Sequence, residues 1–295
     1  MKSGFVAILG QPNVGKSTLL NAILKEKVSI VSPKPQTTRD KILGILNEDD
    51  CQIIFIDTPG IHNSHNKLDD YMNKAISTAK QDVDILLYVI DGTKKINDHT
   101  INHLNKATKG IDNVILVVNK IDDTTYEKLY PELNKCNALD GIRDIVPVSA
   151  IKRKNIDELI KVIKSYLKEG VRYFDDDVYT DKSIKFLTAE IIREKSLWLL
   201  QDELPHGIAV DIVRFEDSLD ICEIDADIVL ERANHKQIVI GKNGSMLKNI
   251  GIKSRVDIEK LVGKQVMLKL FVKVREDWRH NSSTLKSLGY NQQDL

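Results

Sequence analysis

A glycine-rich stretch close to the N-terminus has the residue types and the spacing that hold phosphate groups. It reads GQPNVGKS at residues 10–17 and lies between a strand-like apolar run and a helix-like one. Glycine lets backbone N–H groups approach an anion closely, and the N-terminus of a helix favours negative charge. The pattern GxxxxGK[ST] in this context predicts a nucleotide phosphate loop, in which Lys16 reaches the β- and γ-phosphates and Ser17 binds Mg²⁺. The alternative is a Gly/Lys turn that only begins a helix. The candidate binding residues are Gly10, Gln11, Pro12, Asn13, Val14, Gly15, Lys16, Ser17 and Thr18.

Two further segments could complete the phosphate site. DTPG at residues 57–60 follows an apolar run, so that Asp57 can hold Mg²⁺ through water and the Gly60 amide can face a γ-phosphate; Thr58 and Pro59 belong to the same candidate segment. PKPQTTRD at residues 33–40 offers Thr37 and Thr38 for Mg²⁺ and the γ-phosphate, and such loops become ordered with that phosphate. The residues alone do not decide between the two threonines. The expected metal set is Ser17, Thr38 and Asp57, and the residues expected to support the reaction are Lys16, Thr37, Thr38 and Gly60.

NKID at residues 119–122 indicates which base is bound. Guanine presents its N1–H and its exocyclic amine side by side, and the single carboxylate of Asp122 can accept from both. Adenine lacks this donor pair and would leave the carboxylate unpaired, which disfavours an ATPase or a P-loop kinase. We expect Lys120 to lie over the ring, Asn119 to tie this segment to the phosphate loop, and VSA at residues 148–150, with Ser149 and Ala150, to offer an amide to the guanine O6. The motifs together predict a domain that binds GTP and GDP.

The residue after DTPG is Ile61, where Ras-like GTPases carry a glutamine that orients the attacking water. Isoleucine cannot orient water by hydrogen bonding, so we expect slow hydrolysis or the use of another group. One hypothesis is that Asn13 helps to hold a monovalent cation such as K⁺, which partly replaces an arginine finger. The alternative, that Asn13 only shapes the turn, fits the sequence at least as well.

A second glycine turn, in VIGKNGSML at residues 239–247, does not match the phosphate-loop pattern. It fits a GXXG turn between two helices or between a strand and a helix, whose backbone can clamp about four nucleotides of single-stranded RNA. Lys242 and Lys248 would face phosphates, and Ile238, Ile240 and Ile250 would form an apolar floor for bases. For GXXG alone a plain turn is the alternative, and the surrounding basic surplus favours RNA. The candidate RNA-binding residues are Ile240, Gly241, Lys242, Asn243, Gly244 and Lys248.

Charge is distributed unevenly, although 43 basic residues balance 43 acidic ones. Residues 175–230 contain 15 Asp or Glu against 5 Lys or Arg, whereas residues 231–286 contain 13 Lys or Arg against 5 Asp or Glu. Such a change of sign suggests an anion-binding face; two solvated faces that neutralise each other are the alternative.

Composition is that of an ordinary globular chain. The hydrophobic content of 42% and the charged content of 29% argue against a disordered or membrane-spanning class, and the apolar runs have the length of buried strands. Cys51, Cys136 and Cys222 form no CxxC pair, which favours a reduced intracellular compartment. Because the N-terminus runs straight into a strand-like segment, we expect no signal peptide.

The elements that must position the nucleotide motifs alternate over residues 5–167. Helix-period segments such as 17–24 and 155–167 intervene between apolar, β-branched runs at 5–9, 53–56, 83–90, 114–118 and 145–148. This βαβ pattern predicts a doubly wound, mostly parallel α/β sheet, which binds ligands at the carboxyl ends of its strands. The motifs fall at those ends.

The remainder of the chain predicts a small α+β domain. A helix at 183–203 is followed by strand-like runs at 208–214 and 226–230, a helix from the second glycine turn to about 261, and a strand at 266–274. The polar segment 169–181 has no clear period and is typical of a linker. We therefore predict a GTP-binding domain at residues 1–170, a linker at 171–182 and an RNA-binding domain with a C-terminal tail at 183–295.

The motifs together resemble those of the Era-like GTPases over nearly the whole chain. They are GQPNVGKS, QTTRD, DTPG, NKID and VSA, then ERANHKQIVIGKNGSMLKNIG, and finally a tryptophan at 278 followed by LKSLGY at 285–290. The resemblance implies a Ras-like GTPase domain joined to a C-terminal type II KH domain, in which a hydrophobic residue 61 is normal. It implies binding near the 3′ end of small-subunit ribosomal RNA and a role in assembly and maturation of the small ribosomal subunit. It also implies some peripheral association with the cytoplasmic face of the membrane. We expect a cytoplasmic monomer.

Two other classes share part of the pattern. A tRNA-modification GTPase has the same nucleotide motifs but would need a modification domain, which the basic GXXG segment argues against. A pure RNA-binding scaffold with a structural nucleotide site is disfavoured by the complete set of Lys16, Ser17, Asp57 and Thr37/Thr38. In the favoured interpretation, the GTP state controls RNA affinity.

Overall fold

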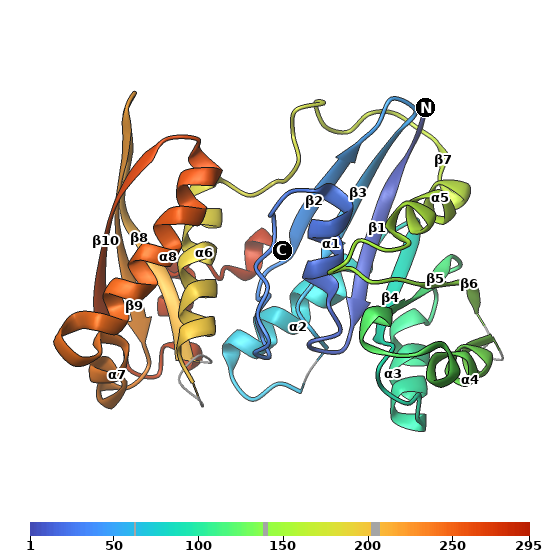
Figure 1. Cartoon of the computed structure of the whole chain (residues 1–295), viewed down its shortest axis with the longest axis horizontal. Helices are drawn as coiled ribbons and strands as arrows, with labels where there is room; N and C mark the ends of the chain where they lie inside the picture. The colour runs from blue at the N-terminus through green and yellow to red at the C-terminus, as the bar shows by residue number, and fades with distance from the viewer. Residues whose placement is uncertain (62, 138–140, 202–206) are drawn as a thin grey trace. The chain divides into compact units, whose positions relative to one another are not determined.

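The structure is a computed structural model that describes residues 1–61, 63–137, 141–201 and 207–295. It divides into two compact units (Figure 1). The division is not a single cut, because two short segments from the first half of the chain belong to the second unit. The first unit comprises Met1–Ser29, Thr38–His62 and Met72–Asp181, and the second comprises Ile30–Thr37, Asn63–Tyr71 and Lys182–Leu295.

A seven-stranded sheet forms the centre of the first unit, in the order β2-β3-β1-β4-β5-β6 with β7 paired to β1. The central strands are parallel, whereas β2 is antiparallel to β3 and β7 is antiparallel to β1. The predicted doubly wound, mostly parallel sheet is therefore confirmed. The strands are β1 (Lys2–Gly10), β2 (Ile42–Asn47), β3 (Cys51–Asp57), β4 (Ile85–Asp91), β5 (Val114–Asn119), β6 (Ile142–Pro147) and β7 (Lys168–Glu169). The helices are α1 (Lys16–Leu24), α2 (Lys67–Ala79), α3 (Asp98–Thr108), α4 (Tyr126–Asn137) and α5 (Ile156–Tyr166), with a 3-10 turn at Ile121–Asp123.

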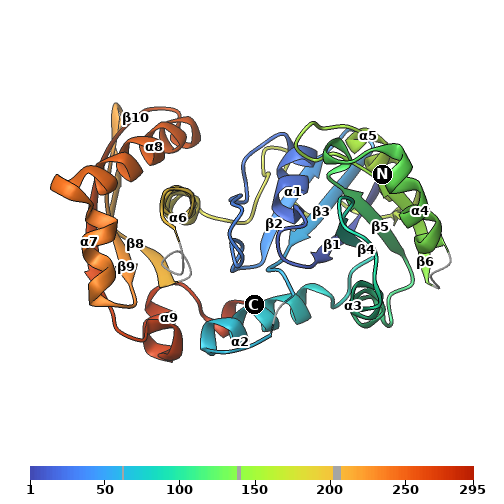
Figure 2. The ribbon, with the colours of Figure 1, turned by 60° about the horizontal axis from the view of Figure 1, so that its bottom comes forward.

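Alternate residues of β1 enter two separate apolar layers. Val6 and Ile8 pack with residues of α1 and α5, whereas Ala7 and Leu9 pack with residues of α2, α3 and α4. Figure 2 shows α1 and α5 on one side of the strands and α3 on the other. Because successive side chains of a strand point to opposite faces, a strand buried on both faces is apolar at every position, which made these strands easy to find in the sequence.

The carboxyl ends of the parallel strands place the nucleotide motifs at one edge of the sheet. β1 ends at Gly10, β3 at Asp57 and β5 at Asn119, each of which begins a motif. In the strand register, Ile8 pairs with Asp57 and Asp91 pairs with Asn119. The phosphate and base motifs therefore come together because of the fold, despite their separation in sequence.

The second unit contains a three-stranded sheet in the order β10-β9-β8, in which β9 is antiparallel to β8 and parallel to β10. Apolar residues of α6 and α8, such as Ile192 and Ile250, share one core with these strands. The elements are α6 (Ile184–Leu199), β8 (Ile208–Asp217), β9 (Ile221–Leu230), α7 (Lys236–Ile240), α8 (Ser245–Val262), β10 (Gln265–Val274) and α9 (Ser282–Ser287). Short 3-10 turns lie at Ala233–His235, Lys242–Gly244, Trp278–His280 and Gln292–Asp294.

Some elements were left open by the sequence or were not expected. The sequence allowed either a helix or a strand before the second glycine turn; residues 236–240 form the helix α7, so the turn lies between two helices. Strand β2 was not predicted, and the polar segment before residue 182 lies along it: Thr180 forms a bridge with Gly44, and its Oγ1 donates to the Leu43 carbonyl at 2.7 Å. Helix α6 ends at Leu199, and the predicted end at residue 203 lies outside the described residues.

Across the described ranges of the chain, no helix combines the length and the apolar character needed to cross a membrane.

Candidate nucleotide site and glycine-turn groove

The phosphate loop joins β1 to α1 through backbone that requires glycine. Gly15 has φ 95° and directly precedes α1, so the first amides of the helix stay available for an anion. A Cβ at Gly15 would lie 2.3 Å from Asn119 Nδ2. The loop and the base motif are thus in such close contact that a side chain at residue 15 has no room.

Lys16 is buried beneath this loop, with 6% of its surface exposed. Its Nζ donates to the carbonyls of Gly10 and Gln11, at 3.1 Å in both cases. Burial lowers the pKa of Lys16 to about 8, although the Asp57 carboxylate acts in the opposite direction. The ammonium group therefore lies in the loop that would hold phosphates, and a bound anion would favour its charged form.

Three side-chain oxygens from separate segments meet next to Lys16. Ser17 Oγ lies 2.7 Å from Thr38 Oγ1 and donates to Asp57 Oδ2 at 2.7 Å. Burial raises the pKa of Asp57, against the Ser17 hydrogen bond and the Lys16 charge, which favour the carboxylate. Asp57 Oδ1 is buried and has no hydrogen-bond partner among the described residues. Hydroxyl and carboxylate oxygens are the donors that Mg²⁺ prefers, so this set fits the metal.

Thr37 lies outside this cluster. Its Oγ1 donates to the Lys34 carbonyl at 2.6 Å and lies 2.8 Å from Ser32 Oγ. The sequence left both threonines open; the structure brings Thr38 to Ser17 and keeps the Thr37 hydroxyl inside its own loop.

The DTPG turn is packed against the phosphate loop. Thr58 Oγ1 donates to the Ile8 carbonyl at 2.9 Å, and the Ile61 amide donates to the Gly10 carbonyl at 3.3 Å. A Cβ at Gly60 would lie 2.8 Å from Pro12 Cα. Gly60 is therefore a position of close backbone approach, and Ile61 packs against the apolar layer on the α3 side of the sheet.

The base motif is joined to the phosphate loop by side-chain hydrogen bonds. Asn119 Nδ2 donates to the Val14 carbonyl at 2.9 Å, and Asn119 Oδ1 accepts from the Ala150 amide at 3.0 Å. Lys120 Nζ donates to the Asn13 carbonyl at 2.8 Å. The segment around Ser149 is thereby fixed to the same edge, while the Asp122 carboxylate stays exposed for a ligand. The structure thus brings the three predicted segments together.

Two side chains of this site, the carboxylate of Asp91 and the hydroxyl of Ser29, were not selected from the sequence. Asp91, at the end of β4, accepts from Lys120 Nζ at 2.7 Å and from Thr93 Oγ1 at 2.7 Å. Burial alone would raise the pKa of Asp91, but these hydrogen bonds outweigh it and hold the pKa below its usual range. Ser29 Oγ donates to Asp57 Oδ2 at 2.8 Å. A carboxylate at a strand end was the available signal for Asp91; nothing in the sequence marked Ser29.

The two glycines of the second glycine turn, Gly241 and Gly244, have different backbone conformations. Gly241 has φ 73° and ψ 171°, a region open to glycine alone, whereas Gly244 has φ 76° and ψ 9°. Between them, Asn243 is left-handed at φ 52°, and both Lys242 and Asn243 are exposed. Because α8 begins directly after Gly244 with no side-chain cap, its first amides point out of the turn.

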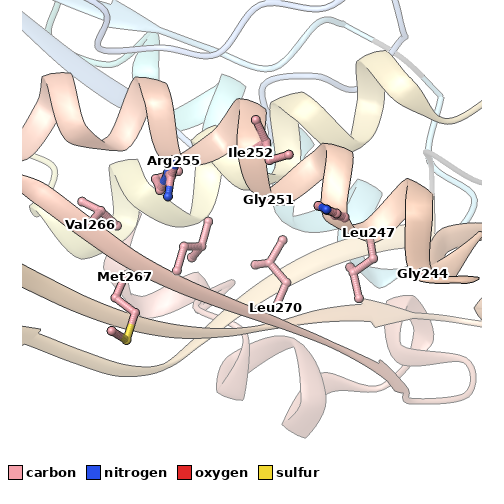
Figure 3. A pocket seen from close by; sticks show the side chains of 10 residues that line it. Gly244, Leu247, Gly251, Ile252, Arg255, Val266, Met267 and Leu270 are labelled. Carbon is pink, nitrogen blue, oxygen red and sulfur yellow. The ribbon is translucent and has the colours of Figure 1, made fainter.

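A groove of about 460 Å³ begins at this turn and runs between α8 and β10 (Figure 3). Among the described residues, its lining is apolar apart from two cations, Lys248 and Arg255, and includes no carboxylate. Of the predicted residues it contains Gly244 and Lys248. The remaining lining residues, which sequence reasoning did not select, are Leu247, Gly251, Ile252, Arg255, Val266, Met267, Leu268 and Leu270.

The predicted isoleucine floor needs correction. Ile250 is fully buried in the core of the second unit, because α8 turns this position toward the sheet. Ile240 is partly buried against the same core, and Ile238 is exposed on α7. The apolar surface of the groove comes from the next face of α8, through Leu247 and Ile252, and from β10.

Comparison with known families identifies both units. A family described as "50S ribosome-binding GTPase" matches residues 5–120, and the KH domain family matches residues 203–279. The predicted combination of a P-loop GTPase domain with a C-terminal KH domain is therefore confirmed.

Relatives match the chain over nearly its whole length. GTPase Era of Clostridium kluyveri is 47% identical over 291 residues, which cover 98% of this chain and 99% of that protein. GTPase Era of Clostridioides difficile is 47% identical over 293 residues, with 98% and 99% covered. An Aquifex aeolicus Era variant bound to GDP·AlF4⁻ and Era in complex with MgGDPNP and nucleotides 1506–1542 of 16S ribosomal RNA are both 39% identical; each has a TM-score of 0.94 and covers 98% of this chain. The chain therefore belongs to the Era family of GTPases.

Proposed function

We propose that this Era-family GTPase is a GTP-gated RNA-binding protein. In this proposal the first unit binds and hydrolyses GTP, and the second binds the 3′ end region of small-subunit ribosomal RNA. The protein would thereby assist assembly and maturation of the small ribosomal subunit. The observation that supports the proposal most strongly is the presence, in one chain, of a guanine-nucleotide site and of a groove whose described lining carries two cations and no carboxylate.

The roles of the nucleotide-site residues follow from their positions. Backbone N–H groups of the loop Gly10 to Ser17, other than Pro12, which has none, bind phosphates; Lys16 offsets their charge, and the Asp122 carboxylate accepts the two guanine donors. Ser17, Thr38 and Asp57 would hold Mg²⁺, which supplies positive charge to the β- and γ-phosphates. With Ile61 packed against apolar residues, no side chain at that position can orient water, and we expect slow intrinsic turnover.

Thr38 is the better metal candidate of the two threonines, because its hydroxyl lies next to that of Ser17 while the Thr37 hydroxyl is used inside its loop. We expect Thr38→Ala to abolish the preference of the site for GTP over GDP and Thr37→Ala to preserve it. Equal losses in both variants would contradict this assignment.

Four features of the groove suit it to single-stranded RNA. The exposed turn at residues 241–244 can approach a backbone closely, the amides at the start of α8 favour a phosphate, and Lys248 and Arg255 add positive charge. The apolar walls from Leu247, Met267 and Leu270 can receive bases.

The choice of the small subunit rests on the longer match. The GTPase family description refers to the 50S subunit but covers residues 5–120, whereas the Era complex with 16S ribosomal RNA matches 98% of the chain. We therefore propose the small-subunit RNA as the ligand. The domain limits at 170 and 183, the monomeric state, the cytoplasmic location and peripheral contact with the membrane remain predictions.

The test is binding of a fluorescent RNA that copies the 3′ end of small-subunit ribosomal RNA, measured with GDP and with GDPNP. We expect tighter binding with GDPNP and loss of binding in Lys242→Asp. Lys260→Asp is a matched control, because Lys260 is exposed in the last turn of α8, at the opposite end of the helix from the 241–244 turn that carries Lys242. Equal affinity in both nucleotide states would contradict gating, and absence of binding in all states would contradict the RNA ligand.

The salt dependence of RNA affinity distinguishes the loss of a phosphate contact from other causes of weaker RNA binding. Each phosphate contact to single-stranded RNA contributes roughly 0.7 to the slope of log affinity against log salt. We therefore expect Lys248→Ala to reduce the slope by about this amount and Lys260→Ala to leave it unchanged. An unchanged slope for Lys248→Ala would remove Lys248 from the RNA contact.

A further inference from the structure

Ser29 is hydrogen-bonded to Asp57, one of the three candidate Mg²⁺ ligands of the first unit, which are Ser17, Thr38 and Asp57. It is buried, with 2% of its surface exposed, and its Oγ donates to Asp57 Oδ2 at 2.8 Å. Ser17 Oγ donates to the same oxygen at 2.7 Å. Two hydroxyl donors on Oδ2 fix the rotation of the carboxyl group, because turning it would break both hydrogen bonds.

The other oxygen of this carboxylate is the one that remains available. Asp57 Oδ1 is buried and has no hydrogen-bond partner among the described residues. A buried carboxylate oxygen without a partner is costly, and such an atom next to Ser17 and Thr38 is explained by a ligand that the protein alone does not supply.

Asn21 holds Ser29 on both sides. Asn21 Oδ1 accepts from the Ser29 amide at 3.0 Å and from the Val28 amide at 3.1 Å, and Asn21 Nδ2 donates to the Ser29 carbonyl at 2.7 Å. The backbone of Ser29 is therefore clamped by a side chain of α1, the helix that begins with Lys16 and Ser17. Helix α1 thus carries the candidate Mg²⁺ ligand Ser17 and, through Asn21, also positions the Ser29 hydroxyl that orients Asp57.

We propose that Ser29 is a positioning residue for Mg²⁺: its hydroxyl, held by Asn21, orients the Asp57 carboxylate so that Oδ1 faces the metal and its water. This inference rests on the proposed Mg²⁺ site. It adds that the affinity for the metal depends on a residue outside the phosphate loop at 10–17, the segment 33–40 that carries Thr37 and Thr38, and the DTPG turn at 57–60. Residues that orient metal ligands by hydrogen bonds typically change metal affinity about 10-fold to 100-fold when they are lost.

The test measures dissociation of a fluorescent GDP from the full chain at a series of Mg²⁺ concentrations and in EDTA. In Ser29→Ala we expect the Mg²⁺ concentration that gives half-maximal slowing of dissociation to rise by about tenfold or more, with the rate in EDTA unchanged. Ser29→Thr, which keeps the hydroxyl, should restore the native midpoint. Ser32→Ala is the matched control, because Ser32 bonds Thr37 and the Lys34 amide rather than Asp57.

The outcomes distinguish the inference from the site on which it rests. If GDP dissociation from the native chain does not respond to Mg²⁺, the proposed metal site itself is wrong. If the native chain responds but Ser29→Ala has the native midpoint, or accelerates dissociation equally in Mg²⁺ and in EDTA, Ser29 has no positioning role. Should Ser29→Ala fail to fold, Ser29→Cys keeps a small side chain with a weak donor and must show the same shift in midpoint.

Discussion

At the scale of the residue, the nucleotide site depends on charged side chains that hold one another in place. Lys16 and Asp57 are both buried and attract each other, and Lys120 is paired with Asp91. An isolated charge in such surroundings would be strongly disfavoured, so each of these groups needs its partner or a ligand. A substitution of one member of such a pair should therefore weaken ligand binding, because the charged side chain of the other member loses its partner.

Asp91 provides the clearest case. We expect Asp91→Ala to weaken GDP binding by about tenfold, because a hydrogen bond to a charged partner contributes roughly 1.5–3 kcal/mol and Lys120 would lose its anchor beside the base. Asp91→Asn, which still offers an oxygen to Lys120, should have a smaller effect. The measurement is titration with a fluorescent GDP.

A double-mutant cycle checks that Asp91 acts through Lys120. In a Lys120→Ala background, Asp91→Ala should cause little further loss of GDP affinity. Fully additive losses would show that Asp91 affects the site by another route.

Asn13 allows a second test at this scale. Its φ of 63° is left-handed, a conformation that asparagine tolerates, which supports the turn-shaping interpretation; the cation hypothesis assigns its carboxamide to K⁺. Under the cation hypothesis we expect faster GTP turnover in K⁺ than in Na⁺, and loss of this difference in Asn13→Gly, which keeps the turn. Equal turnover of the native chain in the two salts would exclude a role for the cation.

What the sequence could predict about the site depended on motifs. Residues inside a fixed pattern, such as Lys16 and Asn119, were identified and were brought together at one edge of the sheet. Thr37 and Thr38 could not be separated, because neighbouring threonines are chemically identical and their difference lies in the path of the loop. Ser29 was missed because a single serine is recognisable only once its distant partner, Asp57, is known. Asp91 was missed because its position at a strand end, the available signal, does not reveal that it pairs with Lys120.

At the scale of the element, the second glycine turn shows how two identical residues can have unequal importance. A Cβ at Gly241 would lie 2.7 Å from both the Cβ and the backbone N of Met246, whereas a Cβ at Gly244 would have nothing within 4 Å. Gly241 also has backbone angles that other residues avoid, while those of Gly244 are in the left-handed helical region.

We therefore expect Gly241→Ala to lower the free energy of unfolding more than Gly244→Ala does. For Gly244→Ala the loss is the left-handed penalty of roughly 1–2 kcal/mol, and for Gly241→Ala the collision with α8 adds to a larger backbone strain. Chemical denaturation of the two variants measures the difference. Equal losses would mean that α8 moves aside at no cost.

Elements were predictable where burial imposes a pattern. The central strands of the first unit are apolar on both faces and stood out, whereas β2 and α7 did not. Strand β2 lies at the edge of the sheet, and the apolar run within α7, residues 238–240, is too short for its period to distinguish a helix from a strand. Ile250 was assigned to the wrong face because the register of α8 had not been fixed.

At the scale of the whole molecule, the loop Ile30–Thr37 belongs to the second unit and is held there by helix α6 of the same unit. The Val31 amide donates to Glu194 Oε1 at 2.9 Å, and the Val31 carbonyl accepts from Trp198 Nε1 at 2.8 Å. At the other end of the loop, the Thr37 carbonyl accepts from Arg193. All three side chains belong to α6, so both ends of the loop, at Val31 and at Thr37, are attached to this helix.

This attachment predicts a signal in tryptophan fluorescence. The chain has two tryptophans: Trp198 is 57% exposed and bonded to the loop, whereas Trp278 is buried and donates to the Gly207 carbonyl. We expect emission to shift to the blue when GDPNP replaces GDP, because the γ-phosphate orders the loop against the indole.

Trp198→Phe should abolish this shift and Trp278→Phe should preserve it. A shift that persists without Trp198 would show that the loop does not report the nucleotide state to α6.

The attachment of the loop to α6 has a consequence for how the binding of GTP and the binding of RNA affect each other. Thr37, bonded to α6, and Thr38, next to Ser17, share one peptide bond, so the second unit and the nucleotide site act on the same short segment of chain. By thermodynamic linkage, any factor by which GTP tightens the binding of RNA is also the factor by which RNA tightens the binding of GTP. An RNA 3′ end in the groove would therefore act as an effector that retains GTP, and its departure would favour nucleotide release.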